Sequence, residues 1–219
     1  MHILLTNDDG VSARGIGILE EVMSVHADKV TVVAPVGQRS AASHSMSINK
    51  DLYCQEIESN YPNVRKFSVN GTPVDCVKTA LEFFLADDMP DLIISGINDG
   101  YNLGSDVLYS GTVSAAMEGP YYQMPAIAVS IGKLTEVRGY ETAGLVAEII
   151  DRVIVGGKFP GILNVNVPGK KGKISIDNVV VVPQAVQIYR NVILQKKDRD
   201  GATCFRVVGD SDMSTAPQF

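Results

Sequence analysis

Short apolar runs alternate with segments of helical periodicity over the first 170 residues. Five runs are apolar almost throughout and are predicted to be strands: Ile3–Thr6, Val30–Ala34, Leu92–Ser95, Ala126–Ser130 and Leu163–Val167. Strands that are apolar on both sides belong to sheets that are covered on both faces. Because strand and helix patterns alternate, the sequence predicts an α/β fold with a parallel, doubly wound sheet.

Helical periodicity between these runs predicts four helices: Gly15–Val25, one that starts at Thr72, one that follows Gly111, and one from about Tyr140 to Val155 that Gly156-Gly157 ends. The start signal in Thr72-Pro73-Val74-Asp75 is strong. It combines an N-cap hydroxyl, a proline at the first helical position and an acid at the third.

The pattern changes after Pro168. Ile174–Val182 and Thr203–Val208 are predicted strands, and the polar stretch Gln195–Gly201 between them contains no helix. This arrangement predicts a hairpin or arm that is attached to the core. Ser43–Glu56 also lacks a helical pattern and is expected to be extended. We therefore predict one domain over residues 1–219, with a core over about 1–168 and a C-terminal arm over about 169–219.

Composition narrows the class of protein. The chain is 45% hydrophobic, which suits one substantial core, and its net charge of −6 disfavours sequence-independent binding to nucleic acid. Its three cysteines form no CxxC pair, which disfavours a disulfide scaffold or a structural zinc site. No signal peptide and no apolar run of membrane-spanning length is visible in the sequence, so we expect a cytoplasmic protein without a membrane partner.

Two adjacent carboxylates follow the first strand, in Asn7-Asp8-Asp9-Gly10. Ligands of open α/β sheets bind at the carboxyl ends of the strands, and buried carboxylates there need a cation or hydrogen-bond donors. Oxygen ligands suit Mg, Mn or Ca. The alternative is a tight turn in which Asp9 caps the next helix. These four residues alone leave both interpretations open.

The loop after the second strand is rich in hydroxyl groups. In Pro35–Ser40, Ser40 offers a neutral oxygen and Arg39 a contact for an anion. His44 lies slightly further along the same loop, among serines, and is the one histidine on a plausible site loop. Such a loop fits a phosphate neighbourhood, although a solvated structural loop has the same composition.

The loop after the third predicted strand, Ser95–Gly104, is rich in glycine and asparagine, which favour left-handed or closely approaching backbone. Asn98 could add a carbonyl oxygen to a metal site. Further on, a helix is expected to start at Ser110-Gly111-Thr112, where free backbone N–H groups could bind an anion. Alternatively, Ser110 and Thr112 only cap that helix. A cation beside a phosphate site favours phosphate-ester chemistry.

Five separated motifs together resemble the SurE (survival protein E) family, the bacterial and archaeal nucleoside monophosphate phosphatases. They cover most of the first 170 residues in the order of the family: Asn7–Gly10; Ala34-Pro35 with Gln38–Ser40; Gly71–Pro73 with Asp75–Val77; Ser95–Asn98 through Gly111–Val113; and Leu163–Pro168. The resemblance implies a Rossmann-like three-layer α/β sandwich with a mostly parallel sheet and an extended C-terminal β-hairpin arm. The arm is exchanged between subunits of a homodimer or homotetramer.

The resemblance also implies a 5′-nucleotidase that uses one divalent cation per subunit (Mg, Mn or Ca) and also acts on 3′-monophosphates. The family's metal ligands correspond to Asp8, Asp9, Ser40 and Asn98. Its phosphate-contacting segment corresponds to Ser110, Gly111 and Thr112, and we add Arg39 and His44 as candidate substrate contacts. No stable complex with nucleic acid is expected.

The sequence departs from the family pattern at several positions. Ala41 and Ser114 stand where the family usually has glycine. After the arm, the family continues with a Gly-Thr-Asp segment and a closing strand, and Gly209–Phe219 has no clear match to either.

The predicted mechanism is hydrolysis by a metal-activated water. Asp8 would orient or deprotonate the water, while Asp9 would mainly bind the metal. One alternative is an aspartyl-phosphate phosphatase with Asp8 as the nucleophile, but the usual second acid two residues later is absent. The other alternative is a nucleotide-binding module without catalysis.

Overall fold

The computed structural model describes residues 1–155, 159, 161–170, 172–186 and 189–211. The chain divides into two compact units. The larger unit comprises Met1–Asn102 and Val107–Val180, and contains every predicted site residue. The smaller unit comprises Leu103–Asp106 and the chain from Val181 onward.

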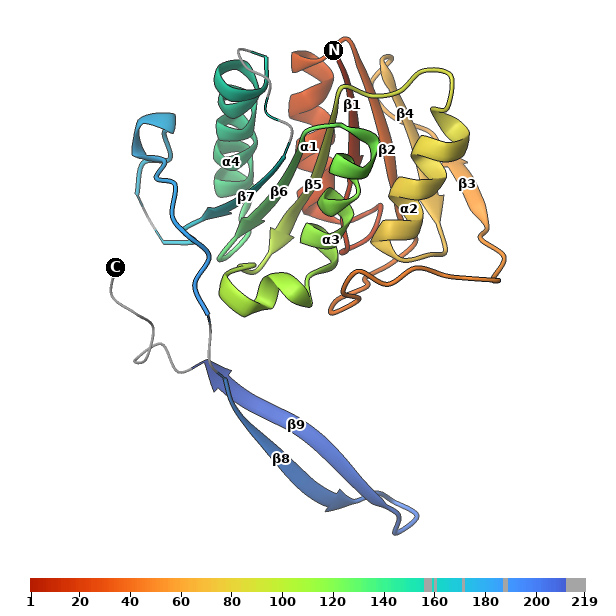
Figure 1. Cartoon of the computed structure of the whole chain (residues 1–219), viewed down its shortest axis with the longest axis vertical. Helices are drawn as coiled ribbons and strands as arrows, with labels where there is room; N and C mark the ends of the chain where they lie inside the picture. Colours follow the sequence, from red (N-terminus) through yellow and green to blue (C-terminus); the bar gives the residue numbers. More distant parts are fainter. Residues whose placement is uncertain (156–158, 160, 171, 187–188, 212–219) are drawn as a thin grey trace. The chain divides into compact units, whose positions relative to one another are not determined.

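The larger unit is built on a seven-stranded sheet with the order β3-β4-β2-β1-β5-β6-β7 (Figure 1). All neighbouring strands are parallel except β3 and β4, which are antiparallel. The strands are β1 (His2–Thr6), β2 (Lys29–Pro35), β3 (Cys54–Ile57), β4 (Val64–Val69), β5 (Leu92–Asp99), β6 (Ala126–Ile131) and β7 (Ile162–Val167). β1, β2 and β5 lie side by side, so the loops that follow them meet at one edge of the sheet.

Helices cover both faces of this sheet, which confirms the three-layer α/β class. Helices α1 (Arg14–His26) and α4 (Glu136–Ile149) lie on one face, and α2 (Pro73–Thr79) and α3 (Gly111–Met117) lie on the other (Figure 1). Short π-helical turns, Ala80–Phe84 and Ile150–Ile154, follow α2 and α4 directly. Three short 3-10 helices span Gly104–Leu108, Gly119–Tyr122 and Ile176–Asn178.

The sheet separates two apolar cores, because successive side chains of a strand point to opposite faces. Ile3 and Leu5 of β1 pack on the α1/α4 side, while Leu4 packs on the α2/α3 side. All three side chains are completely buried. The first strand is therefore covered on both faces, as its uninterrupted apolar sequence predicted.

The predicted helix start at Thr72 is confirmed. The Thr72 hydroxyl accepts a hydrogen bond from the Asp75 N–H (3.1 Å), and Asp75 Oδ2 accepts one from the Thr72 N–H (2.8 Å). Pro73 occupies the first helical position, where its missing N–H costs nothing. This reciprocal capping fixes where α2 begins.

All five strands predicted for the sheet and all four predicted helices are present, with shifted ends. α4 begins at Glu136, earlier than predicted, because Thr135 caps it with a hydroxyl that accepts from the Arg138 N–H. The predicted stop at Gly156-Gly157 lies outside the described residues. The sequence reading missed β4 and recognised β3 only as part of an extended Ser43–Glu56 segment.

The predicted strand Ile174–Val182 is wrong. The structure places the 3-10 helix Ile176–Asn178 within this stretch and assigns no strand there. The Ser175 hydroxyl accepts from the Asp177 N–H and starts this turn, which breaks the extended backbone before the valines. Val180 and Val181 are exposed.

The smaller unit contains an antiparallel hairpin of β8 (Tyr189–Lys197) and β9 (Thr203–Ser211). The predicted strand Thr203–Val208 is thus confirmed, but its partner is β8 rather than Ile174–Val182. A tight turn joins the two strands, with the Asp198 N–H donating to the Ala202 carbonyl (2.9 Å) and Gly201 at φ +80°. The short turn pairs Lys197 with Thr203, so the segment directly before the turn, β8, is the strand that pairs with β9.

Within the described residues, no helix combines the length and the apolar character that a membrane crossing needs.

Candidate functional site

Asp8 and Asp9 extend from a closed turn after β1. The Asn7 side chain accepts from the Gly10 N–H (3.1 Å) and donates to the Gly10 carbonyl (3.0 Å). Asn7 therefore closes the turn and leaves both carboxylates outside it. The cap of α1 is Ala13, with no side-chain hydrogen bond, so the alternative role of Asp9 as a helix cap is wrong.

The turn after β1 touches the loop after β2. Gly10 has φ +107°, and a Cβ on it would come within 3.0 Å of the Gly37 Cα. The Arg39 N–H donates to the Asp8 carbonyl (2.6 Å). Ser40, the next residue, is exposed beside this contact. The backbone of the second loop is therefore hydrogen-bonded to the residue that we predict to act as the base.

The Asp8 carboxylate lies at the start of α3. Asp8 is 6% exposed, and the Thr112 hydroxyl donates to its Oδ1 (2.6 Å). A Cβ on Gly111 would lie 2.8 Å from the Asp8 Cβ and 3.2 Å from the Pro73 Cγ. Burial raises the pKa of Asp8, and hydrogen bonds from Thr112 and from the Gly111 and Thr112 backbone partly oppose this rise. The start of α3 thus packs against the Asp8 side chain, and Pro73 at the start of α2 lies beside Gly111.

Asp9 lies close to a third acid that the sequence reading did not include. Burial raises the pKa of Asp9, and the charges of Asp8 and Asp99 raise it further. The Asp99 backbone N–H and the Gln38 side chain donate hydrogen bonds to Asp9 and lower its pKa. Because these contacts come from the loops after β2 and β5, three loops meet around Asp9.

Asn98 lies in β5, one residue before its end, and pairs with Ser130 of β6, so the prediction that it belongs to a loop is wrong. Its Nδ2 donates to the Gly100 carbonyl (2.9 Å), so the orientation of the amide is set and Oδ1 is its remaining acceptor. Asn98 is next to Asp99, which contacts Asp9. The end of β5 therefore carries an oriented amide oxygen to the edge of the sheet where the two carboxylates lie.

Ser110 and Thr112 have different roles at the start of α3. The Ser110 hydroxyl accepts from the Val113 N–H (3.1 Å) and is the N-cap, as the simpler interpretation held. Thr112 instead donates to Asp8. Ser114, which stands in place of the usual glycine, donates its hydroxyl to the Ser110 carbonyl (2.6 Å) and is accommodated inside the helix.

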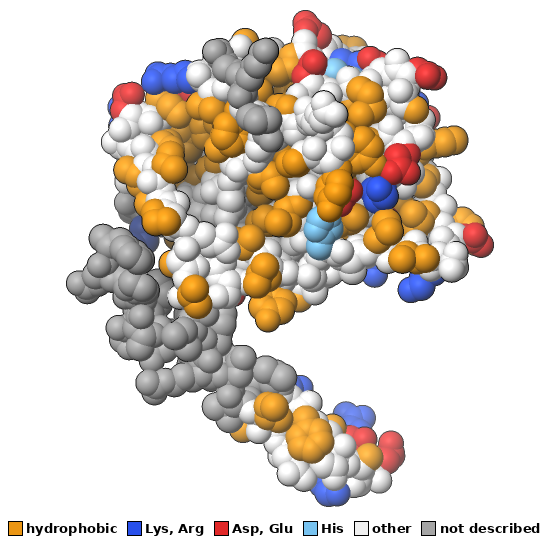
Figure 2. All heavy atoms as spheres, in the orientation of Figure 1, with side chains coloured by type: hydrophobic (Ala, Val, Ile, Leu, Met, Phe, Trp, Pro, Cys, Tyr) orange, Lys and Arg blue, Asp and Glu red, His pale blue; other side chains and the backbone are white. Residues whose placement is uncertain are grey.

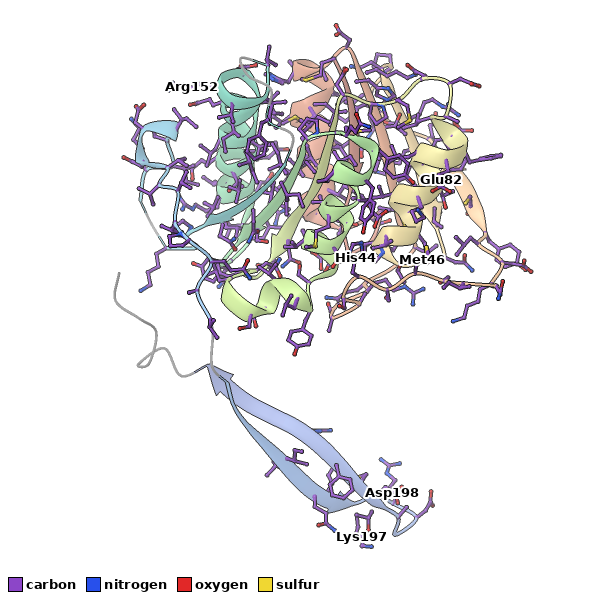
Figure 3. All side chains as sticks on the ribbon, in the orientation of Figure 1. His44, Met46, Glu82, Arg152, Lys197 and Asp198 are labelled. Carbon is purple, nitrogen blue, oxygen red and sulfur yellow. The ribbon has the colours of Figure 1, made fainter. Side chains whose placement is uncertain are left out.

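The His44 side chain (labelled in Figure 3) contacts Glu118, the residue after α3. Its Nε2 lies 2.5 Å from Oε1 of the buried Glu118, and the Lys78 ammonium lies 3.9 Å from the other Glu118 oxygen. Glu118 follows α3, about 10 Å along the helix axis from Gly111 at 1.5 Å per residue. The Arg39 guanidinium donates to the Asn70 carbonyl (3.3 Å). For both residues, contact with substrate stays a prediction.

The predicted metal ligands form an oxygen donor set of two carboxylates, one hydroxyl and one amide. No group of three or more His, Cys, Asp or Glu side chains in the described part of the chain is arranged to hold a metal. The donors nevertheless fit a hard divalent cation, because two buried carboxylates with raised pKa values need positive charge beside them.

Sequence reasoning missed Gln38, Asp99 and the residues that hold the third loop in place. Gln38 and Asp99 lie directly beside the motif residues Arg39 and Asn98. A signal was available for Asp99, because it is a further acid in the same glycine- and asparagine-rich motif as Asn98.

Comparisons with known proteins agree on one family. The sequence model described as "Survival protein SurE" matches residues 3–191. The chain is 39% identical over 213 residues to a protein of Clostridium botulinum (strain Loch Maree / Type A3) named 5′-nucleotidase SurE, covering 96% of this chain and 83% of that protein. A Heliobacterium modesticaldum protein of the same name is 42% identical over 217 residues, with 96% and 76% covered.

A solved structure has the same fold. The crystal structure of the Sure protein from Aquifex aeolicus superimposes with a TM-score of 0.79 at 33% sequence identity. The match covers 96% of this chain and 83% of that one. Sequence and structure comparisons therefore select the same relatives.

Proposed function

The chain belongs to the SurE family, and from this membership we propose that it is a 5′-nucleotidase that hydrolyses nucleoside 5′-monophosphates to nucleoside and phosphate. The observation that carries the proposal is the pair of adjacent carboxylates, Asp8 buried and Asp9 half-buried, at the start of α3, where Asp8 accepts the Thr112 hydroxyl. Adjacent carboxylates that could hold a divalent cation suit a reaction at a phosphate.

We propose that one divalent cation (Mg, Mn or Ca) is bound in each subunit by Asp8, Asp9, Ser40 and Asn98. When bound, such an ion polarises phosphoryl oxygens and lowers the pKa of a coordinated water. The charge of the carboxylates supports this assignment, because burial raises the pKa values of Asp8 and Asp9, and the charge of Asp8 raises that of Asp9 further.

In the proposed mechanism, Asp8 orients the attacking water and accepts its proton. A raised pKa makes a carboxylate a better base near neutral pH. Thr112 holds Asp8 in one orientation through its hydroxyl. We propose that Ser110, Gly111 and Thr112 contact the phosphate of the substrate, since positioning and electrostatics dominate phosphoryl transfer.

An anionic substrate needs the proposed cation, because Asp8, Asp9 and Asp99 bring three acids together at the ends of β1 and β5. On the face drawn in Figure 2, the other acidic side chains lie mainly toward the edge where the strands begin. We add to the proposal activity on 3′-monophosphates, Arg39 and His44 as substrate contacts, assembly as a homodimer or homotetramer, and a cytoplasmic location.

The test is phosphate release by the purified protein from a panel of nucleoside 5′- and 3′-monophosphates with Mg, Mn or Ca. We expect activity that depends on the cation and is lost in both Asp8→Asn and Asn98→Ala. Unchanged turnover in either variant contradicts the site assignment. A phosphoenzyme trapped by rapid acid quench would instead support Asp8 as a nucleophile. Nucleotide binding without phosphate release at any metal would support a binding module.

A further inference from the structure

Strand β7 has one apolar face and one amide face. Leu163, Val165 and Val167 pack on the α1/α4 side of the sheet. Asn164 and Asn166 occupy the alternate positions, next to Ala128 and Ser130 of β6 in the register. β7 is the last strand of the sheet. Two amide side chains on the α2/α3 side of an edge strand are suited to hydrogen-bonding with a neighbouring backbone segment rather than to packing in an apolar core.

These amides bind the backbone of Asn102. The Asn166 side chain accepts from the Asn102 N–H (2.9 Å) and donates to the Asn102 carbonyl (3.1 Å). The Asn164 Nδ2 donates to the same carbonyl (2.9 Å). The Asn102 side chain in turn donates to the Ser130 hydroxyl (2.7 Å). Asn166 thus satisfies both peptide groups of a residue that is 7% exposed.

The chain between Asn102 and Asn98 is held at several further points. The Gly100 N–H donates to the Ile131 carbonyl (2.8 Å), and the Gly100 carbonyl accepts from the Asn98 side chain (2.9 Å). Asp99 Oδ1 accepts from the Leu134 N–H (2.7 Å). Asn102 is therefore the far anchor of a short loop whose near end orients the Asn98 amide.

We propose that Asn166 is a positioning residue for the cation site. It acts through Asn102, which fixes the loop that presents Asn98 Oδ1, and it does not touch the cation or the substrate. This inference rests on the proposed function, because it takes Asn98 to be a ligand. The inference gives Asn166 of β7 a role in cation affinity. Packing of the strand alone would not require an asparagine at this position.

Asn164 is the matched control on the same strand face. Asn164 donates to the Asn102 carbonyl, which Asn166 also reaches, and its Oδ1 accepts from the Asn166 Nδ2 (3.2 Å), whereas Asn166 alone accepts from the Asn102 N–H. Replacing Asn166 by leucine leaves that buried N–H without its acceptor, and replacing Asn164 does not. Both changes put a leucine, which is similar in size to asparagine, on the same strand face, where Asn164 is exposed and Asn166 is half-buried.

The experiment measures Mn²⁺ binding by calorimetry to wild-type protein, Asn166→Leu and Asn164→Leu. Outer residues that orient metal ligands commonly change metal affinity by 10–100-fold, so we expect a dissociation constant raised about tenfold in Asn166→Leu and less than about threefold in Asn164→Leu. Phosphate release at saturating Mn²⁺ should stay within about twofold of wild type in both, because only positioning of the ion changes. Asn166→Ala, which also removes the acceptor for the Asn102 N–H, replaces the leucine variant if that protein does not fold.

Three results overturn the inference. Wild-type affinity in Asn166→Leu shows that Asn166 does not position the site. An equal loss in both leucine variants shows that the strand face is general scaffolding. If the wild-type protein binds no Mn²⁺, the proposed function fails and this inference fails with it. That outcome is distinguished from the other two because it is seen in the wild-type protein.

Discussion

The two faces of the sheet are covered by helices of different kinds. α1 and α4 are regular helices of 13 and 14 residues, whereas α2 and α3 have 7 residues each. On the α1/α4 side, the buried Thr142 hydroxyl donates to the Arg138 carbonyl one turn earlier in its own helix. On the α2/α3 side, the equally buried Thr112 hydroxyl leaves its helix and donates to Asp8.

This difference indicates that the helices on the two faces of the sheet have different roles, with α1 and α4 contributing mainly to stability and α2 and α3 to the candidate site. A long helix gains stability by packing its apolar face, and this packing does not depend on the residues at the ends of the strands. Short helices contribute less packing, but their first residues reach the edge of the sheet. Gly111, at the start of α3, lies against the Asp8 side chain. Pro73, at the start of α2, lies against Gly111. We therefore expect similar substitutions on the two faces to have different effects.

Gly111→Ala should have the largest effect on activity. Its Cβ would lie 2.8 Å from the Asp8 Cβ and 3.0 Å from Oδ2, so the carboxylate must move. Displacement of a catalytic group by about 1 Å can cost 100-fold, and we expect a loss of at least that size in phosphate release from a nucleoside monophosphate.

Gly17→Ala on α1 is the matched control, because a Cβ there would meet nothing within 4 Å. Alanine in place of a helical glycine should stabilise the protein by about 0.5–1 kcal/mol, with activity unchanged. Equal activity in the two alanine variants would contradict the division between the faces.

Thr112→Val should have the next largest effect. Valine keeps the shape but removes the donor to Asp8 Oδ1, so the carboxylate loses its fixed orientation. We expect phosphate release to fall about 10–100-fold, the range seen when supporting hydrogen bonds to reactive groups are removed. Thr142→Val removes a hydroxyl that is equally buried on α4 and should leave turnover unchanged. If turnover falls equally in both, burial of the hydroxyl rather than its contact with Asp8 explains the loss.

Periodicity predicted the elements of both faces, because each strand or helix carries its own signal. Five strands and four helices were found in this way, and the start of α2 was fixed by side chains within four residues. The signal failed where pairing decided the structure. Ile174–Val182 has strand propensity, but the turn after Ser175 interrupts it. β8 is polar at its end and forms a strand because β9 pairs with it.

The candidate site was predictable only in part. Three motifs, each directly after a buried strand, identified the loops that now meet around Asp9. The sequence could not show that Thr112 reaches Asp8 across 104 positions or that Asn166 holds Asn102, because these contacts depend on strand order. Nor could it show that Asn7, rather than an aspartate, closes the turn.

Asp9→Asn should raise stability in the absence of metal. Burial and the charges of Asp8 and Asp99 raise the pKa of Asp9, so the folded state binds this proton more tightly than the unfolded chain. Wild-type stability therefore falls as the pH rises from the unfolded pKa of 3.8 through the higher folded pKa. We expect the variant to melt about 2–4 °C higher at pH 7.5 in EDTA, which corresponds to about 1 kcal/mol for a chain of this size.

This advantage should shrink as the pH falls toward 4, where Asp9 in the folded wild type takes up its proton. Glu20→Gln on α1 should act in the opposite direction, because Glu20 is buried in contact with the Lys66 ammonium (2.5 Å) and its loss leaves that charge unpaired. Lower stability of Asp9→Asn at pH 7.5 would show that its hydrogen bonds outweigh the repulsion.

Ala41→Gly should have the smallest effect. It tests whether the backbone of the loop beside the site is strained at Ala41. Ala41 has φ +55°, in the left-handed region, one residue after Ser40. An alanine there costs about 1–2 kcal/mol, and glycine relieves it but loses about 0.5–1 kcal/mol of chain entropy. We expect a net gain below about 1 kcal/mol in urea unfolding, with turnover unchanged, since the family position usually tolerates glycine. A clear loss of stability would mean that contacts of the Ala41 methyl group, rather than its backbone conformation, determine the choice of residue.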